Sequence, residues 1–307
     1  MSHHIFCDVV DLISKNDVLV LNNTKVIPAK FYAKLESGKK IEILLVSSIS
    51  PDGLTWKILA KPGKMLKDAG ILHAMPLPPI NVINSETIRF NSHKDLEYVL
   101  NNIGQMPLPP YIKRTGETAS GRNGEEEFDD RERYQTVFAK NSGAVAAPTA
   151  ALHFTKELIQ KIKNKGTEVL EITLHVGPGT FLPVRTNDIR EHKLIPESFY
   201  IEQEVWGKIK NAKKNKKRIV ACGTTTVRAL EYVARVDKLS GLTSLFITPG
   251  FEFKIVDAII TNFHLPKTTL LVLVSSFIGL ENMKKIYDEA IKEKYRFFSY
   301  GDAMFVD

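Results

Sequence analysis

The sequence predicts an α/β protein, an α/β barrel-like body interrupted near its start by a small antiparallel β-barrel. Residues 30–88 hold short apolar runs separated by turn residues, which is typical of a small antiparallel barrel or sandwich. From residue 155 onward, strand and helix patterns alternate, which is typical of an α/β layer or barrel. A chain of 307 residues is long enough for two domains. We therefore expect a catalytic α/β domain at 1–28 and 106–307, and an inserted β-barrel domain at 29–105.

Two strands of the expected barrel are visible in the apolar pattern. Residues 41–46 form one apolar run, and residues 54–60 alternate between apolar and polar side chains, as a half-buried strand does. The turn signals around them are Ser37-Gly38, Pro51-Asp52-Gly53 and Lys61-Pro62-Gly63.

A helix and an extended segment are expected after the barrel strands. The helix covers 94–103 and ends at Gly104. Three prolines within 105–112 require an extended chain, because proline cannot continue a helix. The polar residues 114–130 are predicted to form a mobile surface segment.

The second half of the chain alternates helices and strands. Thr155 is the expected cap of a helix that Gly166 ends, and a strand follows at 170–176. A helix at 203–217 precedes a strand at 218–222.

A second helix follows that strand, and its apolar face contains Val227, Leu230, Val233 and Ala234. Short apolar runs at 245–247 and 255–260 predict further strands. The longest apolar run, 268–280, is shorter than the roughly 20 residues that span a membrane. It is therefore expected to be a buried helix or strand.

Composition restricts the class of protein. With 43% hydrophobic residues, the chain is too apolar for a disordered protein. The net charge of 42 − 35 = +7 suits plain solubility or a polyanionic partner such as nucleic acid. Two cysteines, Cys7 and Cys222, lie far apart and predict a reducing compartment rather than a disulfide. The first residues do not resemble a signal peptide, so we expect a soluble cytoplasmic protein.

The first candidate site follows the strand at 170–176, which directs His175 to its polar face. Gly177-Pro178-Gly179-Thr180-Phe181 comes directly after it. Ligands of α/β proteins collect beyond the carboxyl ends of strands, and this turn brings backbone N–H groups beside the imidazole. A tight turn that needs glycine for its dihedral angles explains the same residues equally well, so both interpretations stay open.

The second candidate site is Cys222-Gly223-Thr224-Thr225-Thr226-Val227-Arg228. N–H groups at a helix start and the helix dipole favour an anion, and the threonine hydroxyls add donors. Arg228, one turn into the helix, would bind a carboxylate or phosphate. The alternative is an ordinary helix cap with Arg228 in solvent. Glycine directly between strand and helix allows close backbone approach, which favours the anion site.

Polar and aromatic residues near the carboxyl terminus form two weaker signals. Asn262 and His264 stand after an apolar strand and before Pro266, although a lone histidine is usually structural. The tail 295–305 is rich in aromatic residues, which either pack the last strand or stack on bases and attract a sulfonium. Asp302 in this tail is a candidate base.

The densest basic run contains Lys213, Lys214, Lys216 and Lys217. Such a run is most often a solvated helix end, but it would also suit the phosphates of tRNA. Histidines 153, 175, 192 and 264 lack the close pairing or cysteine partners of a zinc site, so no metal is expected.

Several strings of the sequence resemble one known family. They are LNNTKVIPA at 21–29, GQMPLPPYI at 104–112, YQTVF at 134–138, AAPTA at 146–150, LHVG at 174–177, GTT at 223–225, TNFHLP at 261–266 and the tail 295–304. In this order, and over nearly the whole chain, they resemble the S-adenosylmethionine:tRNA ribosyltransferase-isomerases of queuosine biosynthesis.

The resemblance implies a reaction. The ribosyl group of S-adenosylmethionine moves to 7-aminomethyl-7-deazaguanine at the wobble position of the tRNAs for Tyr, His, Asn and Asp. Isomerisation then gives epoxyqueuosine-tRNA, with release of adenine and methionine. The resemblance also implies an α/β body with an inserted β-barrel, a monomer, and no metal or other cofactor, since S-adenosylmethionine is the ribosyl-donor substrate.

Two departures from the family pattern keep other interpretations open. Family members carry an earlier segment with a Pro…Arg…Ser-Arg-Leu-Leu pattern that this sequence lacks, and Ala151 stands where they commonly have glycine. The alternative is therefore a non-catalytic tRNA-binding relative without that segment. A methyltransferase is a third interpretation, but the acidic-Gly-x-Gly loop expected after its first strand is not in the sequence.

The implied chemistry needs a base at the carbon beside the sulfonium, a clamp for the methionine carboxylate and a lining for adenine. His264 is the expected base, because a histidine pKa near neutrality suits proton transfer, and Asp302 and His175 are alternates. The residues expected to bind S-adenosylmethionine are Gly177, Thr180, Phe181, Thr224, Thr225, Arg228, Asn262, Phe263 and Tyr300.

Overall fold

The structure, a computed structural model, describes residues 1–67, 69–109, 111–112, 130–181, 183–186 and 188–307, with the side chain of Phe181 outside the description. The chain divides into two compact units. The body comprises Met1–Lys25, Gln135–Ser142 and Ala147–Asp307, and the barrel unit comprises Val26–Tyr134 and Gly143–Ala146. The predicted α/β class with an inserted antiparallel barrel is confirmed. The barrel unit is longer than the segment expected from the sequence.

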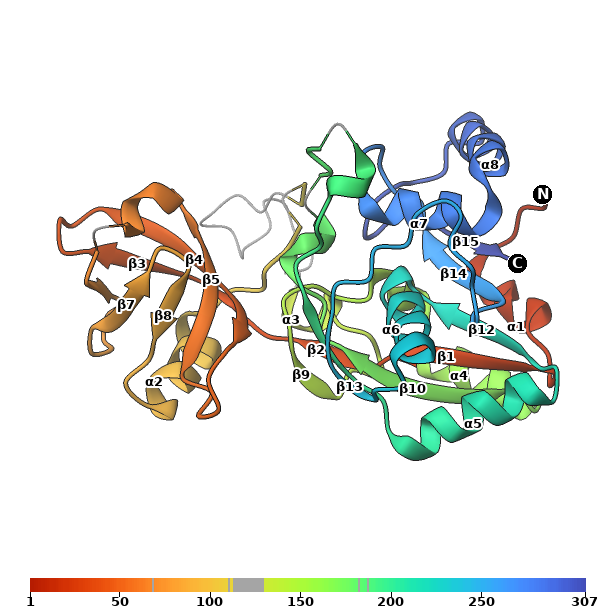
Figure 1. The fold of residues 1–307 in the computed structure, drawn as a ribbon, viewed down its shortest axis with the longest axis horizontal. Coiled ribbons are helices and arrows are strands. Elements are labelled where there is room, and N and C mark those ends of the chain that lie inside the picture. Colours follow the sequence, from red (N-terminus) through yellow and green to blue (C-terminus); the bar gives the residue numbers. More distant parts are fainter. Residues whose placement is uncertain (68, 110, 113–129, 182, 187) are drawn as a thin grey trace, which may run out of the picture. The chain divides into compact units, whose positions relative to one another are not determined.

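A seven-stranded sheet forms the centre of the body, in the order β13-β11-β10-β1-β12-β14-β15 (Figure 1). The strands are β1 (Asp17–Asn22), β10 (Glu168–Leu174), β11 (Glu197–Tyr200), β12 (Arg218–Cys222), β13 (Ser240–Thr243), β14 (Ala258–Asn262) and β15 (Ala303–Val306). The four central strands are parallel and the outer ones antiparallel. The sheet has β13 and β15 as its edges, where the sequence had suggested a barrel-like body.

Helices cover both faces of this sheet, which is why β1 is buried along its whole length. On one face, α1 (Val9–Leu12) and α4 (Lys156–Asn164) pack in a core with Leu19 and Val220. On the other, α5 (Gln203–Lys214) and α6 (Thr224–Val236) contact the central strands (Figure 1).

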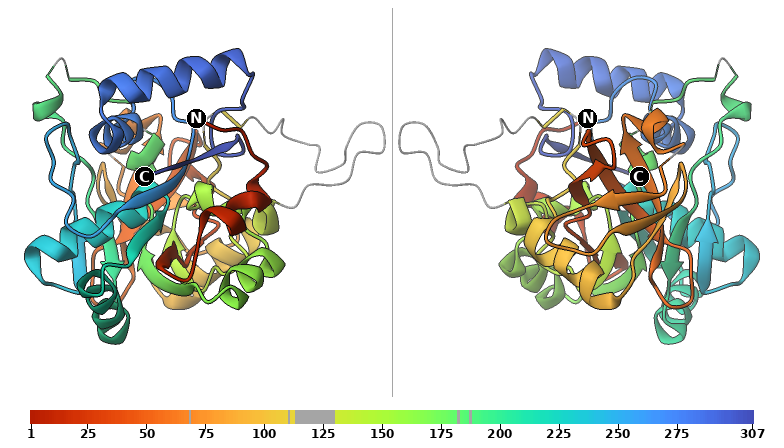
Figure 2. Two further views of the ribbon diagram at one scale, coloured as in Figure 1. Left: turned by 90° about the vertical axis from the view of Figure 1, so that its right-hand side faces the viewer. Right: turned by 90° about the vertical axis from the view of Figure 1, so that its left-hand side faces the viewer.

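Two further helices, α7 (Thr269–Ile278) and α8 (Leu280–Lys292), follow β14. The predicted apolar run is therefore helical. Both ends of the chain lie on the same side of the body (Figure 2).

Helix boundaries follow the predicted caps. The Thr155 hydroxyl accepts the Leu158 N–H at the start of α4, and Gly223, with φ at 88°, separates β12 from α6. The predicted strand at 245–247 is wrong. Leu245 donates its N–H to the Thr243 hydroxyl, and this local bond replaces a sheet partner.

Strand β14 begins three residues later than predicted. The backbone N–H groups of Ile255 and Val256 donate to the buried Glu231 carboxylate, so they do not pair with a strand. The predicted mobile segment lies outside the described residues, apart from Asp130.

The barrel unit contains a closed barrel in the order β3-β4-β5-β8-β7-β6. Its strands are β3 (Lys30–Leu35), β4 (Lys40–Ser48), β5 (Thr55–Lys61), β6 (Ile71–His73), β7 (Ile80–Asn84) and β8 (Thr87–Arg89). Helix α2 (His93–Tyr98) continues as a π-helix over Val99–Ile103 before Gly104, which confirms the predicted helix. Alternate strand residues such as Phe31, Ile43 and Ile58 fill the barrel core.

The remaining elements are short. Strand β2 (Thr24–Val26) pairs with β9 (Asn141–Ala144), and α3 spans Asp130–Arg133. Short 3-10 helices span Phe6–Asp8, Gly63–Leu66, Thr149–His153, Pro178–Phe181 and Ile189–Glu191. Among the described residues, every helix is too short or too polar to cross a bilayer.

Candidate active site

One edge of the body sheet gathers most of the predicted site residues. The parallel strands β10, β1, β12 and β14 end there at Leu174, Asn22, Cys222 and Asn262. The antiparallel strands β11 and β15 begin at the same edge with Glu197 and Ala303. We call it the carboxyl edge, and it is where ligands of α/β sheets bind.

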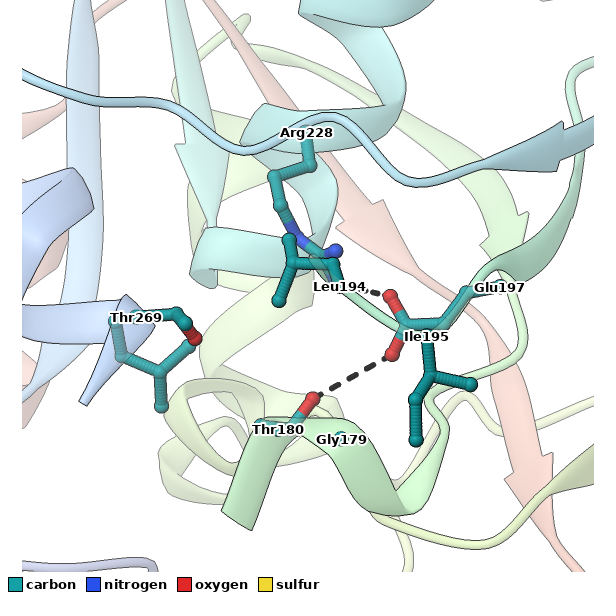
Figure 3. A pocket seen from close by; sticks show the side chains of 8 residues that line it. Gly179, Thr180, Leu194, Ile195, Glu197, Arg228 and Thr269 are labelled. Atoms are coloured by element: carbon teal, nitrogen blue, oxygen red, sulfur yellow. Dashed lines mark hydrogen bonds and ion pairs between the residues drawn. The ribbon is translucent and has the colours of Figure 1, made fainter. Parts of the chain in front are cut away.

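A buried ion pair lies at this edge, between Arg228 of α6 and Glu197 of β11 (Figure 3). Their side chains are 8% and 4% exposed. Glu197 Oε1 also accepts the Gly177 N–H at 2.8 Å and the Thr180 hydroxyl at 3.4 Å. A single carboxylate thus connects the turn after β10 to α6. Both predicted motifs, the glycine turn and the Arg228 helix start, meet at a residue that the sequence analysis missed.

A narrow pocket borders this ion pair (Figure 3). Besides Glu197 and Arg228, it is lined by Gly179, Thr180, Leu194, Ile195, Thr269 and Leu270. The lining is mostly apolar apart from the pair and two hydroxyls.

Asn22, the last residue of β1, forms hydrogen bonds with β10 and α6 at the carboxyl edge. Its Oδ1 accepts the Leu174 N–H at 3.0 Å, and its Nδ2 donates to the Leu174 carbonyl at 2.9 Å and to Thr225 Oγ1 at 3.4 Å. Thr224 and Thr225 are buried at the start of α6, and the Thr226 hydroxyl donates back to the Cys222 carbonyl. Asn22 was missed as a site residue, although it belongs to the first family-like string.

His175 directly follows β10 at the carboxyl edge. Its Nδ1 is 2.8 Å from the Thr24 hydroxyl, and its backbone N–H donates to the Ser198 carbonyl. Burial lowers the pKa of the imidazole below its usual 6.5, so the ring is neutral at pH 7 and able to accept a proton.

His264 lies in the body core rather than at an open surface. It is 9% exposed, and its Nε2 is 2.9 Å from the Thr261 hydroxyl. Its backbone N–H donates to the Tyr287 hydroxyl. Burial lowers the pKa of His264 to about 3, which makes the imidazole a weak base. Its neighbour Phe263 packs in an aromatic cluster that contains Tyr287, Tyr295 and Phe297.

A third polar group surrounds Asn262 at the end of β14. Its Oδ1 accepts the Thr149 hydroxyl at 3.0 Å, and its Nδ2 is 3.4 Å from His153 Nε2. Asp302 lies just before β15 and pairs with Arg296 at 2.6 Å. Burial opposes ionisation of Asp302, but the hydrogen bonds and charge of Arg296 outweigh it and lower the carboxyl pKa.

The remaining predicted residues are placed as follows. Tyr300 is 41% exposed, and the side chain of Phe181 lies outside the described residues.

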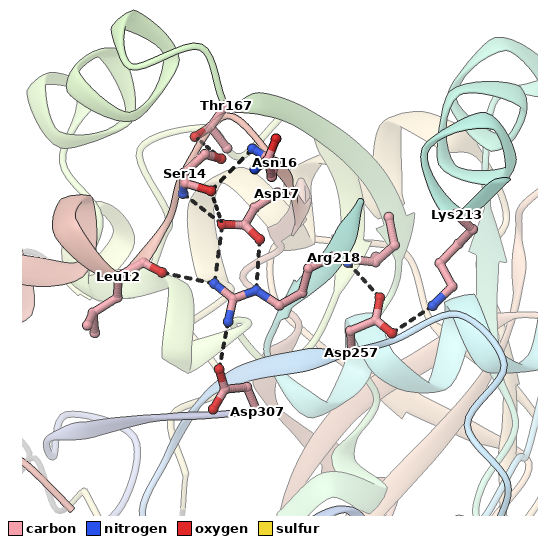
Figure 4. Close-up of polar contacts among 10 residues, drawn as sticks. Leu12, Ser14, Asn16, Asp17, Thr167, Lys213, Arg218, Asp257 and Asp307 are labelled. Atoms are coloured by element: carbon pink, nitrogen blue, oxygen red, sulfur yellow. Dashed lines mark hydrogen bonds and ion pairs between the residues drawn. The ribbon is translucent and has the colours of Figure 1, made fainter. Parts of the chain in front are cut away.

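The lysine run at 213–217 lies at the opposite, amino edge of the sheet, because it directly precedes the first residue of β12. There Lys213 Nζ lies 2.7 Å from Asp257 (Figure 4). In the part of the chain that the structure describes, no cluster of metal-ligating side chains occurs.

Comparison with known proteins decides the family. The model of a family described as queuosine biosynthesis protein matches residues 1–306. The chain belongs to this family. The resemblance found in the sequence is thereby confirmed.

Several members of the queuosine biosynthesis family match the chain along its whole length. The S-adenosylmethionine:tRNA ribosyltransferase-isomerase of Thermosipho africanus is 47% identical, and that of Clostridioides difficile is 44% identical. Each match covers all of this chain and 89% of the relative. A crystal structure of the S-adenosylmethionine tRNA ribosyltransferase from Thermotoga maritima is 34% identical, covers 100% of this chain and 88% of that one, and has a TM-score of 0.52.

Proposed function

We propose that this chain transfers and isomerises the ribosyl group of S-adenosylmethionine onto 7-aminomethyl-7-deazaguanine at the wobble position of tRNA. The product is epoxyqueuosine-tRNA, and adenine and methionine are released. The observation that carries the proposal is the full-length match to relatives named for this activity, at 44–47% identity. A non-catalytic relative is disfavoured, because each of these matches covers the whole of this chain.

The reaction begins with a proton transfer. The sulfonium acidifies the adjacent 5′ carbon of the ribose, and a base removes a proton there to give a sulfur ylide. The ylide then opens the ribose ring by breaking its C4′–O bond, which expels adenine from C1′ and leaves a vinyl sulfonium and an aldehyde. The aminomethyl nitrogen attacks C4′ and loses its proton, the regenerated ylide carbon closes the carbocycle on the aldehyde, and the resulting alkoxide displaces methionine to form the epoxide. Of the three predicted bases, His264 is buried with a pKa of about 3, and Asp302 is already paired with Arg296. His175 is neutral at pH 7 and half-buried at the carboxyl edge, so we favour it as the base.

The methionine end of the substrate is assigned to the pocket beside Arg228. The guanidinium would bind the carboxylate, and Leu194, Ile195 and Leu270 would contact the thioether stem. Tyr300 has enough exposed ring to stack on adenine. The tRNAs for Tyr, His, Asn and Asp are the proposed acceptors. We further propose that the protein acts in the cytoplasm as a monomer, without a metal.

Product analysis tests the proposal. Incubation with S-adenosylmethionine and precursor tRNA should release adenine and methionine. Formation of S-adenosylhomocysteine would indicate methylation instead, and binding without turnover would indicate a non-catalytic relative.

The base assignment has a separate test. His175→Gln should lower kcat by about 10²–10⁴-fold, the usual contribution of a positioned base. His93→Gln is the matched control, because His93 begins α2 in the barrel unit and should leave kcat unchanged. In the wild type, kcat/KM should fall as pH drops through the lowered His175 pKa, with the midpoint below 6.5. Normal turnover by His175→Gln would remove the assignment.

A further inference from the structure

The barrel unit carries a one-sided array of basic side chains. In β3, β4 and β5, alternate residues point into the core and the others point outward (orange strands in Figure 1). The outward residues include Lys30, Lys34, Lys40, Lys57 and Lys61. We call this surface the lysine face. It also carries Tyr32, Glu42, Leu44 and Leu59.

Strand register arranges these residues in rows across the face. Lys34 lies opposite Lys40, and Lys61 lies opposite Glu42. Lys30 is in register with Leu44, which is in register with Leu59. Neighbouring strands are about 5 Å apart, and alternate residues of a strand about 7 Å apart, so the ammonium groups form a closely spaced array.

Lysines dominate the charge of the lysine face. Five lysines share the face with one glutamate, and among the described residues none of the five forms an ion pair with a carboxylate. Like charges directly opposite each other, as in Lys34 and Lys40, destabilise a strand pair. An anionic partner would relieve this repulsion.

The other side of the same barrel differs in charge. There, Arg89 of β8 forms a 2.6 Å ion pair with Asp52, and the exposed residues of β7 include the uncharged Asn81 and Ile83. Among the six barrel strands, the lysines are therefore confined to β3, β4 and β5.

An aromatic ring and an aliphatic side chain lie among the lysines. Tyr32 is 40% exposed, its ring lies 4.1 Å from Lys40 Nζ, and its hydroxyl donates to Glu42. Leu59 is 42% exposed on the same face. A basic surface with an interleaved aromatic ring is the combination that binds RNA, because phosphates meet the cations and bases stack on the ring.

We infer that the lysine face binds the sugar-phosphate backbone of the tRNA substrate. The inference rests on the proposed function for the identity of the RNA, and it deepens that function by assigning the acceptor a surface. The face competes for this role with the lysine run at 213–217, whose Lys213 is already paired with Asp257.

The test measures tRNA affinity as a function of salt, with the full chain. In the barrel variant, Lys34, Lys57 and Lys61 are each replaced by Gln. Each lost phosphate contact reduces the salt slope by about 1, so the slope should fall by about 2–3 and the Kd should rise about 10–30-fold at physiological salt. The control variant replaces Lys214, Lys216 and Lys217 by Gln and should keep the wild-type slope. The affinity for S-adenosylmethionine should be unchanged in both variants, and neither variant should have a lower Tm than the wild type.

Three results would overturn the inference. The first is a wild-type salt slope in the barrel variant, and the second is a loss of slope confined to the control variant. Binding of the wild type to phosphatidylserine vesicles in preference to tRNA would also overturn it, because it would indicate a membrane partner. Adenine release is scored separately, so a chain that binds tRNA through this face without turnover would refute the proposed function and leave the RNA surface standing.

Discussion

Two arginine–carboxylate pairs lie at opposite edges of the body sheet and differ in how completely the chain satisfies them. At the amino edge, Arg218 Nε donates to Asp17 at 2.7 Å, and its other nitrogens donate to Asp307 at 2.6 Å and to the Leu12 carbonyl at 3.0 Å (Figure 4). Asp17 also accepts the N–H and the hydroxyl of Ser14. Each nitrogen of the Arg218 guanidinium therefore has a hydrogen-bond partner within the chain. The network connects Leu12 and Asp307, near the two ends of the chain, to the sheet.

The pair at the carboxyl edge is less completely satisfied. In the described part of the chain, Glu197 is the one hydrogen-bond partner of the Arg228 guanidinium, and the pair borders a pocket (Figure 3). A guanidinium has five N–H donors. Burial and pairing with a carboxylate therefore do not by themselves identify a ligand-binding arginine. What distinguishes Arg228 from Arg218 is that its guanidinium borders a pocket and has N–H donors beyond those that bind Glu197.

Replacement of each arginine should give the largest difference between the two edges. Arg228→Ala should raise the KM for S-adenosylmethionine about 30-fold, because a hydrogen bond to a charged group contributes about 2 kcal/mol. Arg218→Ala should leave that KM unchanged. Both variants should lower the free energy of unfolding by about 3 kcal/mol, because each leaves a buried carboxylate, Glu197 or Asp17, without its cation. Steady-state kinetics and urea unfolding measure both effects. Equal KM values for the two variants would show that the edges do not differ in function.

Removal of the carboxylate at each edge should show the same difference in thermal stability. Glu197→Gln leaves the Arg228 cation buried without its carboxylate and should destabilise the fold by about 3 kcal/mol. If the substrate carboxylate binds Arg228, S-adenosylmethionine replaces the lost anion. It should therefore raise the Tm of this variant by more than it raises that of the wild type.

Asp17→Asn is the matched control for that measurement. The partner of Asp17 is Arg218, whose other nitrogens already donate to Asp307 and to the Leu12 carbonyl. S-adenosylmethionine should therefore raise the Tm of Asp17→Asn only as much as it raises that of the wild type. An identical enhancement in both variants, or in neither, would contradict the assignment of Arg228 as the carboxylate clamp.

Much of the fold was predictable from local sequence. Alternation placed the barrel strands, and Gly223 marked the β12–α6 junction. The start of β14 was not predictable, because it depends on Glu231, a buried side chain 24 residues earlier than Ile255. The strand predicted at 245–247 is absent because here too a side chain accepts a backbone N–H group. The Leu245 N–H donates to the Thr243 hydroxyl and not to a neighbouring strand.

The site was predictable where strand ends define it and not where long-range pairing does. Arg228 and the 177–180 turn stood after strands, so their place at the carboxyl edge followed from the chain order. Glu197 begins a short antiparallel strand whose partners are set only by the folded sheet, and nothing local marked it. His264 was chosen for its residue type, but its pKa depends on burial, which the sequence does not reveal.

The last and smallest expected effect concerns His264, whose environment contrasts with that of His175. The folded-state pKa of His264 is about 3 and its ordinary value is 6.5, so below pH 6.5 the unfolded chain binds a proton that the folded chain does not. Its contribution to stability is complete above pH 6.5 and declines as pH falls toward 3. Between pH 6.5 and 5, the free energy of unfolding should therefore fall by roughly 2 kcal/mol.

Urea unfolding at the two pH values measures this change, with His264→Gln as the comparison. The variant removes the titrating group, so its loss between pH 6.5 and 5 should be smaller than that of the wild type by the same amount. An equal loss in both proteins would show that His264 does not carry the pH dependence. It would then have a more ordinary pKa and would return as a candidate base beside His175.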